Sequence, residues 1–102
     1  MENKTIKEQI IDKLQQLRMN VRNTTLIDEI YNIVWDNIDD GQYTDNYDKA
    51  NYIANQLGGI KCSLEIAEDY WNNGDENFAE PHYNQAIWDM ERLIRYVEQK
   101  IE

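Results

Sequence analysis

Apolar residues recur at every third or fourth position through most of the chain, the spacing that places them on one face of an α-helix. The pattern predicts a first helix over about 4–18, which begins with a capping box at Thr5–Glu8. A second helix follows from the cap offered by Thr25–Asp28 and ends at Asp40-Gly41. No run alternates apolar and polar residues over five positions, so we expect no strands.

The second half of the chain continues the helical pattern. Thr44 or Asp45 can cap a third helix, and Gly58-Gly59 either stops it or forms a hinge inside a longer helix. A fourth helix is expected over about 60–72, and Pro81 suits the first turn of a fifth. The apolar stripe of this last helix is the longest in the chain: Tyr83, Ala86, Ile87, Met90, Leu93, Ile94, Val97 and Ile101.

These elements predict an all-α fold. We expect four to five short helices packed as antiparallel hairpins, with the long C-terminal helix at the centre. The 102 residues are enough for a single helical domain, 1–102, with one modest hydrophobic core.

Charge changes the picture, because it is unevenly distributed. The net charge is −10, but the segment from Asn23 to Glu91 carries −13, and Lys49 and Lys61 are its only basic residues. Such a segment repels nucleic acid and anionic membranes and attracts basic protein surfaces. A plain solvated surface is the alternative interpretation.

The N-terminal residues do not form a signal peptide, and no apolar run is long enough to span a membrane. We therefore expect a cytoplasmic protein of a bacterial host cell. Cys62 is the one cysteine, so no internal disulfide forms. We expect it to be a small core residue, because His82 would be its only available base in catalysis.

The stretch DYWNNGDENFAE, residues 69–80, resembles a calcium loop of the EF-hand type at five of its key positions. It fails at the third, where Trp71 has no side-chain oxygen. A second near-match begins at Asp36 and fails at Ile38 and Tyr47. Asp, Asn and Gly are also the residues that turns prefer, so we interpret 69–80 as a turn between two helices.

Residues 66–87 also resemble one tetratricopeptide-type helical hairpin, which would imply a peptide-binding repeat. The resemblance covers about a third of the chain. Ser63 and Glu91 stand where that family has its Trp and its late Pro. We interpret the matching residues as packing positions that helical hairpins in general share.

The acidic pairs Asp36-x-x-Asp39 and Glu65-x-x-Glu68 resemble those of the all-α nucleotide pyrophosphohydrolases, which implies Mg²⁺-dependent hydrolysis as one hypothesis. Those enzymes favour Glu in the first pair and add basic residues that hold phosphates. Here a strongly acidic segment without a basic cluster would repel a triphosphate. We therefore predict no enzyme activity, no metal site and no cofactor.

The remaining prediction is a protein-binding surface, in which carboxylates steer a basic partner and aromatic rings supply contact energy. A row of carboxylates on a rigid helical body can imitate a phosphate backbone. The composition, rich in Asn, Asp, Ile, Tyr and Lys, resembles that of proteins from an AT-rich genome, such as a low-GC bacterium or its phages. The small, acidic, single-domain chain without catalytic motifs resembles phage or mobile-element anti-defence proteins of the anti-CRISPR or antirestriction type. The expected partner-binding residues are Asp36, Asp39, Asp40, Tyr43, Asp45, Tyr47, Asp48, Asp69, Asp75 and Glu76.

The partner is then a protein with a basic surface, such as a nucleic-acid-binding enzyme, without direct contact to nucleic acid or membrane. The alternative is a small helical adaptor, immunity protein or homo-oligomer that uses the apolar side of the last helix, at Leu93, Val97 and Ile101. In that case binding would depend little on salt.

Overall fold

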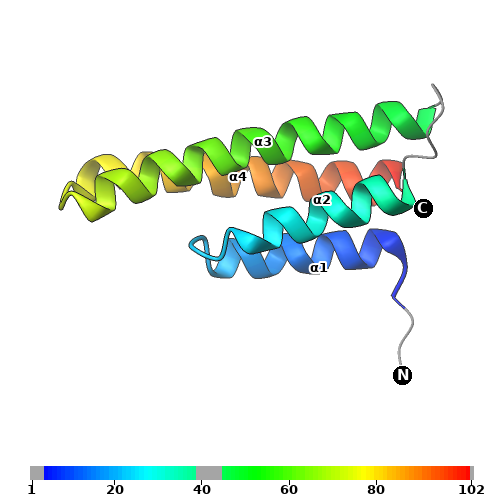
Figure 1. Cartoon of the computed structure of the whole chain (residues 1–102), viewed down its shortest axis with the longest axis horizontal. Helices are drawn as coiled ribbons and strands as arrows, with labels where there is room; N and C mark the ends of the chain where they lie inside the picture. Colours follow the sequence, from blue (N-terminus) through cyan, green and yellow to red (C-terminus); the bar gives the residue numbers. More distant parts are fainter. Residues whose placement is uncertain (1–3, 39–44, 102) are drawn as a thin grey trace.

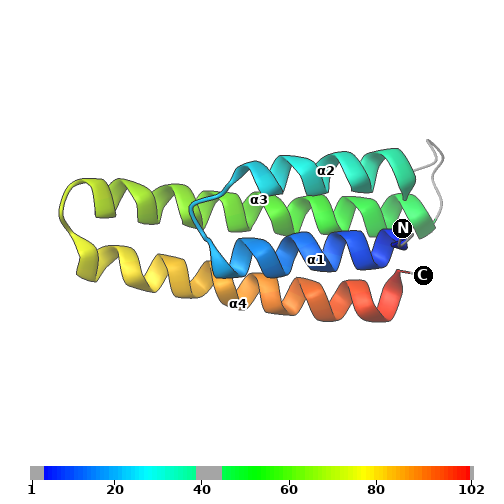
Figure 2. The ribbon, with the colours of Figure 1, turned by 90° about the horizontal axis from the view of Figure 1, so that it is seen from below.

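The computed structural model describes residues 4–38 and 45–101. Within them the chain forms four α-helices and no strand: α1 (Ile6–Met19), α2 (Thr25–Asn37), α3 (Asp45–Asn72) and α4 (Glu76–Lys100). Successive helices run in opposite directions (Figures 1 and 2). The predicted all-α class is confirmed. In the part of the chain that the structure describes, no helix is long and apolar enough to cross a membrane.

The contacts between helices form a closed ring. α1 packs on α2 and α4, and α3 packs on α2 and α4, whereas α4 makes no close backbone approach to α2 in the described residues. The last helix is long, as predicted, but it occupies one corner of a four-helix bundle rather than its centre.

Both N-terminal helices begin close to their predicted starts, with one difference in capping. The capping box of α1 is present: the Glu8 amide donates to the Thr5 hydroxyl (3.1 Å), and the Thr5 amide donates to the Glu8 carboxylate (3.4 Å). The predicted cap of α2 at Thr25 is wrong. Thr25 is already the first helical residue and Thr24 is the N-cap, without a side-chain capping hydrogen bond. The Thr25 hydroxyl donates to the side-chain oxygen of Asn23.

Gly58-Gly59 does not interrupt α3, which runs through both glycines for 28 residues. The two predicted helices, third and fourth, are therefore one. Leu57 and Ile60, on either side of the pair, are fully buried, so tertiary packing continues across the weak point. Glycine is disfavoured in a helix by about 1 kcal/mol relative to alanine, a cost that this burial exceeds.

The predicted turn at 72–74 is confirmed and forms a Schellman motif. The Asp75 amide donates to the Tyr70 carbonyl (2.8 Å) and the Gly74 amide to the Trp71 carbonyl (3.1 Å). Gly74 has φ +83°, the left-handed conformation that this motif requires of its glycine. Residues 69–80 are thus the end of α3, a turn at 73–75 and the start of α4, and not a twelve-residue calcium loop.

α4 starts earlier than predicted. It begins at Glu76, directly after the turn, so Pro81 is its sixth residue and lies inside the helix rather than in its first turn. Proline has no amide hydrogen, so one intrahelical hydrogen bond is missing there. The predicted stripe of α4 is confirmed from Ala86 to Ile101 except at Ile87, which is half-buried and lies outside the core cluster.

The hairpin of α3 and α4 is longer than the pair α1 and α2, so its turn projects past the α1–α2 turn (Figures 1 and 2). The shared core includes Leu64 and Ala86 but not Ala67 and Ala79, which are fully buried outside it. We call residues 65–85 the hairpin tip. We call the four-helix part, with α1, α2 and the rest of α3 and α4, the base.

Candidate protein-binding surface

The predicted partner-binding residues separate into two groups at opposite ends of α3. Asp36, Tyr47 and Asp48 lie at the base, whereas Asp69, Asp75 and Glu76 lie in the hairpin tip. From residue 48 to residue 69, α3 rises about 32 Å. The predicted residues therefore do not form one continuous surface.

Four predicted residues have no described side chain. Asp39, Asp40 and Tyr43 lie outside the described residues, and Asp45 is described only as the first residue of α3.

At the base, the aromatic residues pack against one another. Trp35 and Tyr47 have ring centroids 6.4 Å apart, and Tyr52 and Tyr96 lie at 4.2 Å. All four are half-buried beside the core. Burial, together with Tyr52 and the exposed carboxylate of Asp48, raises the pKa of Tyr96. These rings therefore pack within the fold, whereas the sequence analysis assigned aromatic rings to contact with a partner.

In the hairpin tip, the charge is of one sign. The tip contains no Lys or Arg, and His82 is its only side chain that can become positive. Its six carboxylates are all exposed, and none takes part in the four ion pairs found among the described residues. They are Glu65, Glu68, Asp69, Asp75, Glu76 and Glu80.

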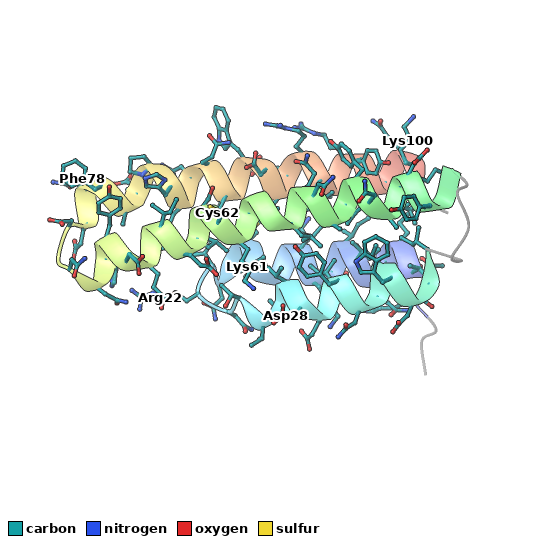
Figure 3. All side chains as sticks on the ribbon, turned by 45° about the horizontal axis from the view of Figure 1, so that its top comes forward. Arg22, Asp28, Lys61, Cys62, Phe78 and Lys100 are labelled. Atoms are coloured by element: carbon teal, nitrogen blue, oxygen red, sulfur yellow. The ribbon has the colours of Figure 1, made fainter. Side chains whose placement is uncertain are left out.

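Large apolar side chains are exposed in the same segment. Of the six found exposed in the described chain, four belong to the tip: Ile66, Tyr70, Trp71 and Phe78. Phe78 is 63% exposed and lies at the end of the α3–α4 hairpin that is farthest from Lys100 (Figure 3). Exposed aromatic rings among carboxylates have the composition of a protein interface.

The aromatic rings of the tip lie on two sides of the interface between α3 and α4. Tyr70 stacks on His82 (5.6 Å between centroids, 15° between planes) and lies 5.7 Å from Phe78. Trp71, the next residue along α3, is turned by about 100° around the helix and instead lines two hollows with Tyr83. His82 is half-buried, which agrees with its predicted position at the boundary of the fold.

Sequence reasoning missed Glu65, Glu68 and Glu80 as binding candidates, and it did not select Tyr70 or Trp71, which are both exposed. The available signal was the stretch 62–91, which contains eight acidic residues and no Lys or Arg. That these residues share one exposed hairpin followed only from the unequal helix lengths.

The structure does not bring the proposed Mg²⁺ ligands together. Asp39 lies outside the described residues. Trp35 contacts Tyr47, so Asp36 lies near the start of α3, whereas Glu65 follows Tyr47 by 18 residues, or about 27 Å of helix. Among the described residues, no three His, Cys, Asp or Glu side chains gather to hold a metal ion.

Cys62 is exposed, which corrects its predicted place in the core. It lies on α3 between the buried residues Ile60 and Leu64, on the outer surface of the hairpin (Figure 3). Ile60 and Leu64 face the interface between α3 and α4, and Cys62 does not.

A scan against protein-family models finds no match, and neither a search of curated proteins nor a search of solved structures finds a similar chain.

Proposed function

We propose that this protein is a non-enzymatic inhibitor that covers the basic, nucleic-acid-binding surface of a protein partner, as anti-defence proteins of phages and mobile elements do. The observation that carries the proposal is the hairpin tip: six exposed carboxylates outside any ion pair, in a segment without Lys or Arg. A field of one sign speeds the encounter with a surface of the opposite sign.

The helical frame supports this function physically. A helix holds carboxylates three or four residues apart at a spacing of about 5–6 Å, as at Glu65, Glu68 and Asp69. Because the helix already fixes the backbone that holds these carboxylates, little backbone freedom is lost when a partner binds. A row of fixed negative charges is also what a nucleic-acid-binding surface recognises in phosphates.

The adaptor alternative has less support. Leu93, Val97 and Ile101, the side chains on which it depended, are 1%, 0% and 6% exposed and belong to the shared core. They are not available to a partner in the folded bundle.

The first test is capture from the lysate of a low-GC bacterium with active defence systems, washed at low and at high salt, with bound proteins identified by mass spectrometry. We expect a basic nucleic-acid enzyme that is retained at low salt and released at high salt. DNA should then compete with the protein for that enzyme. A partner that resists salt, or that DNA does not displace, would contradict the proposal.

A matched pair of variants separates the tip from total charge. Glu65→Gln, Glu68→Gln and Glu80→Gln remove three tip charges; Asp12→Asn, Glu29→Gln and Glu91→Gln remove three charges that are ion-paired at the base. The two triple variants have the same net charge. We expect the tip variant to bind the captured enzyme about tenfold or more weakly, and the base variant to bind nearly as the parent does.

A further inference from the structure

Two adjoining hollows lie where the α1–α2 turn meets the hairpin tip. One, of about 250 Å³, is lined by Trp71, Tyr83, Glu76, Glu80 and Asn77. The other, of about 300 Å³, shares Trp71 and Tyr83 and is completed by residues 19–22 of the α1–α2 turn. Trp71 and Tyr83 thus lie between the carboxylates of Glu76 and Glu80 on one side and residues 19–22 on the other.

The structure already contains a guanidinium at this place. Arg22, from the α1–α2 turn, extends toward the tip (Figure 3) and holds its guanidinium carbon 5.0 Å from the centre of the Trp71 ring. That distance is within the range of a cation–π interaction, for which tryptophan is the best ring and arginine the more frequent cation. The chain itself therefore shows what chemistry the Trp71 surface accepts.

Tyr83 lines both hollows. Its hydroxyl oxygen is buried and has no hydrogen-bond partner among the described residues. Buried hydroxyls almost always have a partner, so this oxygen is an unsatisfied polar group in a residue that lines the hollows.

We propose that Trp71, Tyr83, Glu76 and Glu80 form an arginine-binding site, which takes a guanidinium from the basic partner in place of Arg22. The ring of Trp71 stacks on the guanidinium plane, the carboxylates of Glu76 and Glu80 neutralise it, and Tyr83 completes the lining of the hollow. This inference rests on the proposed function, because it names the side chain of the partner that the hairpin tip recognises.

Arginine suits this site better than lysine. A guanidinium is planar, stacks on an aromatic face and offers several donors at once, whereas an ammonium is a compact and strongly hydrated charge. A second copy of the chain is a poor occupant, because its own tip would bring six further carboxylates against these.

The test uses the full chain labelled with ¹⁵N and two helical peptides of equal length, one with arginines at i and i+4 and one with lysines there. Trp35, Trp71 and Trp88 each give one indole N–H signal, so the two other tryptophans are internal controls. We expect the arginine peptide to shift the Trp71 signal alone. It should bind about two- to thirtyfold more tightly than the lysine peptide, the range that cation–π energies give.

Variants locate the site. Trp71→Ala and Trp71→Leu should both reduce arginine-peptide affinity to that of the lysine peptide. Phe78→Ala, which removes a more exposed ring on the other side of the interface between α3 and α4, should leave the affinity unchanged. Circular dichroism checks that each variant keeps its helix content.

The outcomes separate this inference from the proposed function. Equal affinity for the two peptides, no binding of either, or loss of binding in Phe78→Ala but not in Trp71→Ala would overturn the arginine site. If the triple variant of the tip still binds the captured enzyme more weakly than the parent while the peptide test fails, the proposed function stands. If neither charge variant affects capture, the proposed function itself fails.

Discussion

The base and the hairpin tip contain the same kinds of residues, but they use them differently. At the base, Tyr52 and Tyr96 pack as a half-buried pair, and Arg18 is 3.5 Å from Glu91 across two helices. In the tip, Trp71 and Phe78 are exposed, and the segment contains no Lys or Arg to pair with its carboxylates. The fold gains stability from the first arrangement and little from the second. Under the proposed function, stability and recognition are separated along α3 and α4.

The largest expected difference between the two regions is in stability. Leu57→Ala should destabilise the bundle by about 2–5 kcal/mol, because Leu57 is fully buried in the shared core. Phe78→Ala should cost less than about 0.5 kcal/mol, because its ring is mostly exposed. Urea denaturation followed by circular dichroism measures both. Similar losses in the two variants would show that the tip ring contributes to folding.

The second prediction concerns local opening. Ala67 is buried outside the shared core, whereas Leu57 belongs to it. We expect the Ala67 amide to exchange with deuterium at least about tenfold faster than the Leu57 amide, because fewer buried contacts must break there. Native-state hydrogen exchange by NMR provides the comparison. Equal protection would mean that the tip and the base open as one unit.

The third prediction uses the glycines. Gly74→Ala should destabilise the protein by about 1 kcal/mol, because its φ of +83° strains any residue with a Cβ. Gly59→Ala should stabilise it by about 0.5–1 kcal/mol, because the new methyl group meets no atom within 4 Å and α3 is already helical there. Thermal melting of the two variants should therefore shift in opposite directions. A shift in the same direction would contradict the continuous α3.

The smallest effect is expected at high pH. Burial, Tyr52 and Asp48 raise the pKa of Tyr96 above its ordinary value of 10.0. The unfolded chain then loses this proton first, so stability is intact below about pH 10 and falls as the pH rises toward the folded pKa. In Tyr96→Phe, the alkaline loss should be smaller than in the parent protein. Urea melts at pH 8 and pH 11 measure it, and an unchanged alkaline loss would assign it to other groups.

Most of the fold followed from the apolar pattern. The capping box at Thr5, the stripe of the last helix and the turn at Gly74 each needed only neighbouring residues, so sequence alone was enough. The differences from the prediction at Gly58-Gly59 and Pro81 have one cause. Local propensity marks the glycine pair as a stop or a hinge and Pro81 as a helix start, but packing between α3 and α4 outweighs a propensity of a few kcal/mol.

The candidate site was less predictable. Asp69, Asp75 and Glu76 were predicted from the sequence as binding residues, and they do lie in the hairpin tip. Trp71 and Glu80 lie there too, but they were not among the predicted binding residues. Helical periodicity places a residue on a face of its own helix. It does not say whether a neighbouring helix reaches that face.

The sequence by itself determined that the chain is helical, where most helices begin and end, and that its middle is strongly acidic, because these properties depend on near neighbours and on composition. Only the tertiary structure decided that α1 and α2 stop short of the α3–α4 turn. That difference in length leaves Phe78 exposed at the end of the hairpin and brings Arg22 of the α1–α2 turn over Trp71, beside the hollow that Glu76 and Glu80 line. Exposure depends on which segments meet in space, and that is a property of the packed chain.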